Sequence, residues 1–303
     1  MITAEGLTKR FGDKTAVDDV SFTIQPGTVT GFLGPNGAGK STTMRMIVGL
    51  DRPTSGRVTV SGREYRKLPA PLSEVGVLLD AKAVHTGRTA RDHLRSLAAT
   101  HGIPTSRVDE VIDLAGIGSV ARRRAGKFSL GMGQRLGIAS ALLGDPHTLI
   151  LDEPVNGLDP EGVLWVRQFA RRAASEGRTV LLSSHLMSEM AQTADHVIVM
   201  GRGTVLADAP LDELVRAWTR NTVRVRTPRE ADLAAAVAGP DVEIVRIAPD
   251  LLDIVGLPAA RIGDLAADRG IPLHELTPAT GSLEDAYLAL TGDAVEYRSQ
   301  EIA

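Results

Sequence analysis

A glycine-rich segment near the N-terminus has the residues needed to hold phosphate groups. It matches the pattern G-x-x-x-x-G-K-[ST] in full. Glycines let backbone N–H groups curl around phosphates, and the helix expected from Lys40 would point its positive end at them. Lys40 is suited to reach the β- and γ-phosphates, and the Ser41 hydroxyl to bind Mg²⁺. The segment predicts a nucleotide site made of Gly34, Pro35, Asn36, Gly37, Ala38, Gly39, Lys40, Ser41 and Thr42.

Two carboxylates follow an apolar stretch later in the chain. Residues 148–151 are Thr-Leu-Ile-Leu, and Asp152 and Glu153 come directly after them. Ligands of open α/β sheets bind at the carboxyl ends of the strands. Asp152 is therefore suited to hold Mg²⁺, and Glu153 to orient or deprotonate an attacking water. The alternative is that both acids merely cap the turn at Pro154.

A phosphate loop alone leaves kinases, GTPases and motor proteins open, and the segment at 128–135 narrows the choice. It reads Phe-Ser-Leu-Gly-Met-Gly-Gln-Arg and resembles the signature sequence of ATP-binding cassette (ABC) proteins, in the variant typical of drug-exporter ATPases. Ser129 and the amides near Gly131 would stand at a helix start, where hydroxyl, N–H and helix dipole favour an anion. The resemblance implies that this anion is the γ-phosphate held by the opposite subunit of a head-to-tail homodimer. Leu130 and Met132 depart from the consensus.

Three single residues extend the resemblance, and a fourth departs from the family pattern. Asp159, in Asn-Gly-Leu-Asp, matches the loop through which the two cassettes communicate, and His185 matches the histidine that senses the γ-phosphate. Phe11 matches the aromatic residue that stacks on adenine. Asp80 stands where most members carry a glutamine that contacts Mg²⁺. A carboxylate there could still bind the metal or its waters, but it lacks the amide donor.

The elements that must position these residues alternate between strand and helix. Strands are expected at 2–7, 16–24, 29–33, 148–151 and 179–182, and helices from residue 40 and over 161–174. Residues 86–125 are expected to be mostly helical, with Thr89 as an N-cap. The alternation predicts an α/β fold with a largely parallel, helix-covered sheet. The resemblance makes this a P-loop ABC cassette over residues 1–218, a mixed sheet with a helical subdomain at about 83–143.

A second domain is expected over residues 222–303, after a hinge near Arg220 and Asn221. Its pattern is strand 222–227, helix 229–237, strands 242–247 and 251–256, helix 259–268 and strand 272–276. This βαββαβ order predicts a small α+β, ferredoxin-like arrangement. Ser282 and Asp285 form a capping box for a last helix. The segment is similar to the accessory tail of some exporter ATPases, and we expect it to supply no catalytic group.

Composition restricts the partners. The 303 residues carry a formal net charge of −3 and no cysteine, which argues against nucleic acid as a partner and excludes disulfides and thiol catalysis. No window approaches the roughly 18 apolar residues that span a bilayer, so another chain would have to cross the membrane. The resemblance implies a cytoplasmic ATPase, peripheral on the inner face of the cell membrane. It would use ATP and Mg²⁺ and drive export through a separate integral membrane permease.

Two other functions compete with this one. The first is a soluble ABC-family ATPase acting on a non-membrane partner such as the ribosome or DNA. Such proteins usually join two cassettes or insert long coiled coils or basic segments, and this chain has neither feature. The second is a regulatory module that binds nucleotide without hydrolysis. It is disfavoured because every hydrolytic residue is present: Lys40, Ser41, Asp152, Glu153 and His185.

Overall fold

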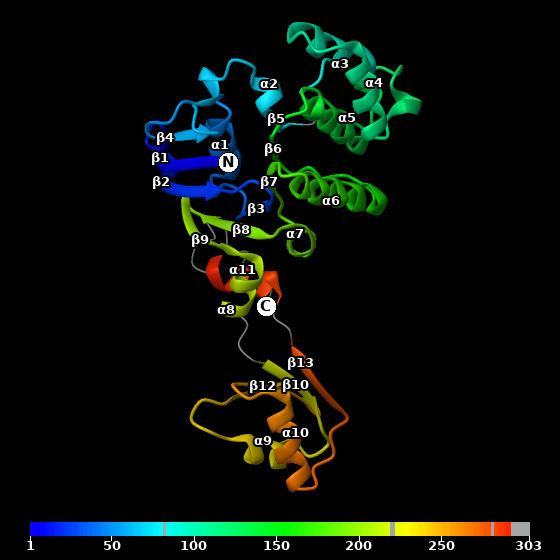
Figure 1. Ribbon diagram of the computed structural model, residues 1–303. Coiled ribbons are helices and arrows are strands. Elements are labelled where there is room, and N and C mark those ends of the chain that lie inside the picture. The colour runs from blue at the N-terminus through cyan, green and yellow to red at the C-terminus, as the bar shows by residue number, and fades with distance from the viewer. Residues whose placement is uncertain (81–82, 219–221, 280–281, 292–303) are drawn as a thin grey trace. The chain divides into compact units, whose positions relative to one another are not determined.

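The computed structural model describes residues 1–80, 83–218, 222–279 and 282–291, which form two compact units (Figure 1). The first contains Met1–Leu211 and resumes at Leu290, and the second comprises Asp212–Ala289. The hinge expected at Arg220 and Asn221 lies outside the described residues. The assignment of 1–218 as the cassette and 222–303 as the accessory domain stays a prediction. Within the described ranges, no helix is long and apolar enough to cross a bilayer.

The first unit is built on a six-stranded sheet with the strand order β5-β6-β7-β3-β8-β9. Its strands are β3 (Val29–Leu33), β5 (Val75–Leu78), β6 (Thr148–Leu151), β7 (Thr179–Ser183), β8 (His196–Gly201) and β9 (Thr204–Pro210). All neighbours are parallel except β8 and β9, which confirms the mixed sheet. Strands β3, β6 and β7 are wholly buried, as expected for apolar strands covered on both faces. Their carboxyl ends therefore meet at one edge.

A three-stranded antiparallel sheet lies beside the first, in the order β2-β1-β4. It consists of β1 (Ile2–Phe11), β2 (Lys14–Ile24) and β4 (Ser55–Val60). Both sheets bury side chains in one apolar core, with Ile2 and Phe22 from the smaller sheet and Phe32 and Ile150 from the larger. This common core holds the phosphate loop, which follows β3, at a fixed place.

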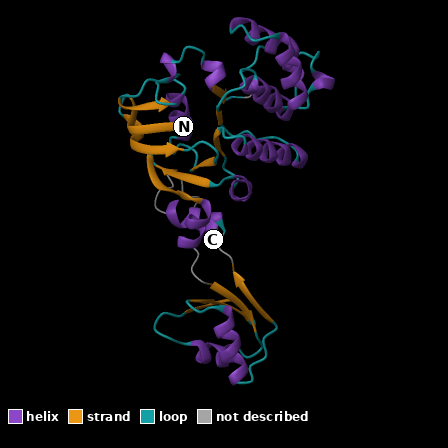
Figure 2. Ribbon diagram, in the orientation of Figure 1, coloured by secondary structure: helices purple, strands orange, loops and turns teal. Residues whose placement is uncertain are grey.

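Some helices of the first unit pack on its two sheets, and the others form a separate group (Figures 1 and 2). Helix α1 (Lys40–Ile47) packs on β2 and β4 of the smaller sheet, whereas α2 (Pro71–Glu74), α6 (Pro160–Ser175) and α7 (Met187–Thr193) pack on strands of the larger one. The helical group consists of α3 (Ala90–Thr100), α4 (Thr105–Leu114) and α5 (Leu130–Leu142), which pack on one another. Thr89 caps α3 by accepting from the backbone N–H of Asp92 at 3.1 Å, as predicted. The 3₁₀ turns are Tyr65–Lys67, Gly118–Val120 and Ala125–Lys127.

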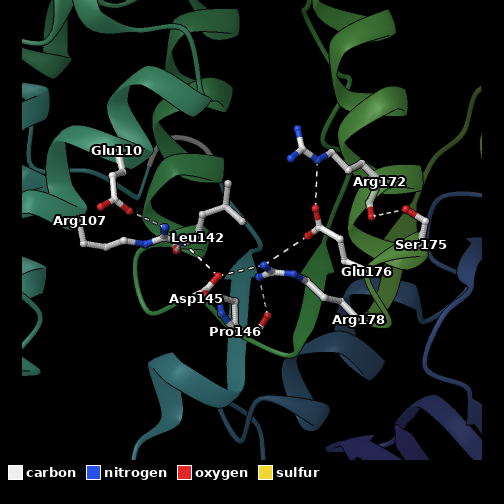
Figure 3. A network of polar contacts seen from close by, with 9 residues as sticks. All are labelled: Arg107, Glu110, Leu142, Asp145, Pro146, Arg172, Ser175, Glu176 and Arg178. Atoms are coloured by element: carbon white, nitrogen blue, oxygen red, sulfur yellow. Dashed lines mark hydrogen bonds and ion pairs between the residues drawn. The ribbon is translucent and has the colours of Figure 1, made fainter.

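A network of charged side chains ties the helical group to the sheet (Figure 3). Arg107 on α4 donates to the carbonyl of Leu142 at the end of α5 (3.0 Å) and pairs with Asp145 (3.3 Å). Arg178, just before β7, pairs with the same carboxylate at 2.9 Å and donates to the carbonyl of Pro146. Both guanidinium side chains are only about a fifth exposed, so water screens these contacts less than ordinary surface pairs. The network fixes where α5 runs into β6.

The second unit confirms the predicted βαββαβ order. Its elements are β10 (Thr222–Arg226), α9 (Glu230–Val237), β11 (Glu243–Ala248), β12 (Leu251–Val255), α10 (Ala259–Asp268) and β13 (Glu275–Ala279). The sheet order is β11-β12-β10-β13 with every pair antiparallel, which is the split βαβ arrangement. Helix α8 (Leu211–Trp218) precedes this βαββαβ arrangement in the chain, and α11 (Leu283–Thr291) follows it. The unit has its own apolar core, including Val225, Ile254 and Ile262.

The last strand lies three residues later than predicted. The prediction placed it at residues 272–276, short of Pro278, and proline is confined to the edge strands of a sheet. Strand β13 is an edge strand, and Pro278 pairs opposite Val223 on the one neighbour that β13 has. The capping box is confirmed, since the Asp285 N–H donates to the Ser282 hydroxyl at 3.1 Å. In return Ser282 donates to the Asp285 carboxylate, which lowers the pKa of Asp285 below its usual value.

A core substitution should show that the second unit is held by its own apolar residues. Ile254 is fully buried in that core, so Ile254→Ala should lower its free energy of unfolding by about 2–5 kcal/mol. Ile247 on β11 is half exposed, and Ile247→Ala should change it by less than about 0.5 kcal/mol. Calorimetric melting of the full chain would report both. Equal shifts for the two variants would contradict the assignment of the core.

Candidate nucleotide site

The phosphate loop links the end of β3 to the start of α1. Helix α1 begins at Lys40 with no acidic residue in its first turn, so its free N–H groups and positive end remain available to an anion. Gly39 precedes it in a left-handed conformation (φ 103°), and a Cβ there would stand 2.6 Å from the carbonyl oxygen of Ala16. Gly34 is equally restricted by the carbonyl of Met200. These two positions need glycine for the loop to keep its shape.

Lys40 lies beneath this loop, with only 7% of its surface exposed. Its ammonium donates to the carbonyls of Gly34 (2.7 Å) and Pro35 (3.2 Å), so the side chain is folded against the loop that it would serve. Burial lowers the pKa of Lys40, while the negative charges of Glu153 and Asp152 act in the opposite direction. The ammonium is thus partly stripped of water and placed among groups that favour its charged form.

Asp152 joins three elements at the sheet edge. Its Oδ2 accepts from the Ser41 hydroxyl on α1 at 2.7 Å, and its Oδ1 accepts from the Ser183 hydroxyl at the end of β7 at 2.5 Å. The backbone N–H of Asp152 also donates to the carbonyl of Leu78 on β5. The predicted metal-binding residues Ser41 and Asp152 therefore meet. Both carboxylate oxygens bond to other elements, so this acid does not cap the turn at Pro154.

Glu153 adopts a left-handed backbone conformation, with φ of 49°. Few non-glycine residues do so, and the strain must be offset by neighbouring contacts. Its N–H donates to the Ser183 hydroxyl at 2.9 Å, and its Oε2 lies 2.7 Å from Nδ1 of His185. Its carbonyl accepts from the Gln134 amide at 3.1 Å. The structure thus brings Glu153 and His185 together, as the sequence-based prediction requires.

Three of the other predicted residues lie at the starts of helices α5 and α6. Ser129 caps α5 by accepting from the Met132 N–H at 3.3 Å, and its side chain is exposed. Asp159 caps α6 by accepting from the Gly162 N–H at 2.9 Å. Gly131 packs on the loop between Glu153 and α6, where a Cβ on Gly131 would stand 3.2 Å from the carbonyl oxygen of Gly157. Among the hydrogen bonds of the described chain, none joins Ser129, Gly131 or Asp159 to residues 34–42.

Phe11 and Asp80 lie at or just beyond the ends of strands in different sheets. Phe11 ends β1, is 51% exposed and carries the Lys9 ammonium 4.8 Å from its ring centre. It is open for stacking on a planar base. Asp80 is exposed two residues beyond β5, which runs parallel to β6. It therefore lies toward the same sheet edge as Asp152 and Glu153.

Sequence reasoning missed two residues of the site. Ser183 is fully buried and contacts both acids, and Gln134 is 5% exposed and contacts the Glu153 backbone. Ser183 ends an otherwise apolar strand, and a polar residue at the carboxyl end of such a strand was the available signal. Gln134 sits inside the quoted signature segment. Its contact with a residue 19 positions away has no local signal.

Comparisons with known proteins agree with this geometry. The ABC transporter family profile matches residues 17–156, and a domain of unknown function matches residues 221–284. The chain is 35% identical over 304 residues to the bacitracin transport ATP-binding protein BcrA of Bacillus licheniformis, covering 96% of this chain and 97% of that protein. It is 35% identical to the lantibiotic transport ATP-binding protein SrtF of Streptococcus pyogenes, over 70% and 92% of the two chains.

Solved structures show the same fold. The structure of an ATP-binding subunit of an ABC transporter superposes with a TM-score of 0.66 at 25% identity, over 72% of this chain and 92% of that one. The chain belongs to the ATP-binding proteins of the ABC transporter family. The expected cassette fold and ATPase activity are confirmed, and so is the resemblance to drug-exporter cassettes. In this ABC ATPase, the two acids and the histidine predicted to take part in hydrolysis lie together at the sheet edge described above.

Loss of the Ser183 hydroxyl should disturb both acids at once. Ser183→Ala would leave the partly buried Asp152 Oδ1 without this donor and the Glu153 N–H without its acceptor. We expect a loss of about 1–3 kcal/mol in free energy of unfolding, as for unsatisfied buried groups, together with slower ATP hydrolysis. Ser175→Ala is the matched control, because that exposed hydroxyl donates only within its own helix. Chemical denaturation and phosphate release would measure both, and a Ser183→Ala protein equal to the control would contradict this role.

Proposed function

We propose that this chain binds MgATP at residues 34–42, closes on a second copy head to tail, and so powers export through a separate integral membrane permease. The main support is that one chain holds only part of the expected site. One chain holds the loop, the metal-binding pair and the Glu153–His185 pair together. The capped start of α5, by contrast, is exposed and makes no hydrogen bond to its own phosphate loop among the described residues. A second copy would complete each site with that helix start.

The metal-binding role of Ser41 and Asp152 is supported by the chemistry of the pair. Mg²⁺ is usually held by one or two protein oxygens together with substrate phosphates and water. A hydroxyl and a carboxylate oxygen that already lie 2.7 Å apart fit that demand. When bound, the ion would neutralise charge that develops on the β- and γ-phosphates. Asp80 is the proposed outer contact to the metal or its waters, in place of the usual glutamine.

Glu153 is the proposed base for the attacking water, and His185 its partner at the γ-phosphate. A candidate base must lie within hydrogen-bond reach of the group it acts on, and the 2.7 Å contact between Oε2 and Nδ1 places both side chains at one point. The ammonium of Lys40 would leave the loop carbonyls for the phosphates. Phe11 would stack on the adenine ring.

Ser129 and Gly131 would serve the nucleotide of the opposite subunit. Ser129 caps α5, so the N–H groups of the first turn point out of the chain toward an incoming anion. Asp159, at the start of α6, would make its contact across the same interface. Each residue is assigned by its place at an exposed or half-exposed helix start.

Export and the membrane partner are supported by the relatives. Those described above are named as transport ATP-binding proteins for bacitracin and a lantibiotic. They do not favour the alternative of a ribosome-associated ATPase. We therefore assign this chain to the cytoplasmic face of the cell membrane as a peripheral subunit, with no nucleic acid partner. Purification together with a membrane protein encoded beside it, and stimulation of ATP hydrolysis by that protein, would test the assignment.

Two substitutions should separate binding from hydrolysis. Glu153→Gln keeps the phosphate loop intact, so ATP affinity should be unchanged while hydrolysis slows by at least about 10²-fold, as when a general base is lost. The trapped protein should elute as a dimer with ATP during size-exclusion chromatography. Lys40→Ala should instead weaken ATP binding, measured by calorimetry. Equal loss of binding in both variants would show that the two roles are wrongly assigned.

A pair of changes at Ser129 should separate the interface role from the capping role. Ser129→Asp keeps a good N-cap but sets a negative charge against the γ-phosphate of the other subunit. It should leave the melting temperature and ATP binding by the monomer near wild type, and it should abolish the rise of specific activity with protein concentration. Ser129→Ala also loses the cap, at about 1 kcal/mol. A wild-type rate per subunit that stays constant down to monomeric concentrations would refute the dimer itself.

A further inference from the structure

Gln134 is an amide buried where packing alone would not call for one. It lies on α5 with 5% of its surface exposed, and its Nε2 donates to the carbonyls of Glu153 (3.1 Å) and Asn156 (3.4 Å). Two carbonyl acceptors require that this end of the amide is the nitrogen. The other end, Oε1, is buried and has no hydrogen-bond partner within the part of the chain that the structure describes.

This unpaired oxygen bears on why the residue is a glutamine. A buried polar atom without a partner is unfavourable, and Leu or Met would fill the same space without one. The amide is therefore explained by what its nitrogen does. That nitrogen reaches across 19 residues to the backbone of Glu153, which has the left-handed conformation that needs outside support.

The same helix meets the Glu153 turn at a second place. The first turn of α5 packs on the loop that follows Glu153, so closely that a Cβ on Gly157 would stand 2.2 Å from Leu130 Cδ2. Ser129 begins this turn and has its side chain exposed. The same helix thus has an exposed N-terminus and, one turn further on, a side chain that is hydrogen-bonded to the backbone of Glu153.

We propose that Gln134 is a positioning residue for Glu153, which ties the turn carrying that carboxylate to the helix that engages the opposite subunit's nucleotide. This inference rests on the proposed function of Ser129 and Glu153. When α5 is set by contact at its N-terminus, the two carbonyl bonds of Gln134 set the Glu153 backbone with it. One chain already forms these bonds by itself, so closure of the neighbouring site would hold the carboxylate in this position.

The first test removes the donor and keeps the volume. Gln134→Leu should lower kcat for ATP hydrolysis by about 10- to 100-fold, in the range for a misplaced catalytic group. KM and the affinity of the monomer for ATP should stay within about twofold. Gln168→Leu on α6 is the matched control, because Gln168 is exposed. That variant protein should hydrolyse ATP at the wild-type rate. A Gln134→Leu protein with wild-type kcat would overturn the proposal.

The second test distinguishes positioning from a general loosening of α5. In a Glu153→Gln background, Gln134→Leu should still form the ATP-dependent dimer, because Ser129 and its cap are untouched. Loss of that dimer would show that Gln134 only maintains the helix. If the Glu153→Gln protein alone fails to dimerise with ATP, the proposed function fails rather than this inference.

The third test uses protonation to restore the donor. Burial raises the pKa of a carboxyl group, so a glutamate at 134 would gain a donating O–H as pH falls. The kcat of Gln134→Glu relative to wild type should therefore rise between pH 8.5 and pH 6, whereas that of Gln134→Leu should stay flat. Taking the ratio to wild type removes any pH dependence that both proteins share. A flat ratio for Gln134→Glu, with melting temperature followed at each pH, would count against the donor role.

Discussion

The shared carboxylate of Asp152 is the contact on which this site depends. One oxygen is held by a hydroxyl from α1 and the other by a hydroxyl from β7, so the acid links the phosphate loop to the sheet edge. Hydrogen bonds to a charged acceptor are among the stronger ones in proteins. Because Ser183 also receives the N–H of Glu153, the same hydroxyl fixes the next residue. The residues proposed for metal binding and for hydrolysis are therefore positioned by one short chain of contacts.

Lys40 likewise fixes the shape of the phosphate loop through hydrogen bonds. The ammonium is buried and satisfied by two carbonyls of the loop, so it holds the loop in shape before a ligand arrives. Phosphate oxygens can take the place of those carbonyls. Because they are charged, they accept hydrogen bonds from an ammonium more strongly than neutral carbonyl oxygens do. The loop is pre-organised, and the exchange of partners favours an anion over an empty site.

Local patterns predicted most of this protein. The phosphate loop, the caps at Thr89 and Ser282 and the βαββαβ order of the second unit all follow from residues within one turn or one strand of each other. The bounds of β13 did not, because a strand can include Pro278 only at a sheet edge, and the edge position depends on tertiary pairing. Ser183 and Gln134 were missed for the same reason. Their partners lie 19 to 31 residues away, and no spacing rule connects them.

Helix α5 shows why such long-range contacts gather at this site. Its C-terminal half is buried, with Leu136, Ile138 and Leu142 in a helix that packs on β5, α3 and α4. Arg107 fixes its last carbonyl, so the helix is anchored at the end away from Ser129. A helix anchored at one end and exposed at the other transmits contact at its N-terminus to whatever its middle holds. Gln134 in its second turn holds the backbone of Glu153, and this bond is the proposed link between the nucleotide of one subunit and the carboxylate of the other.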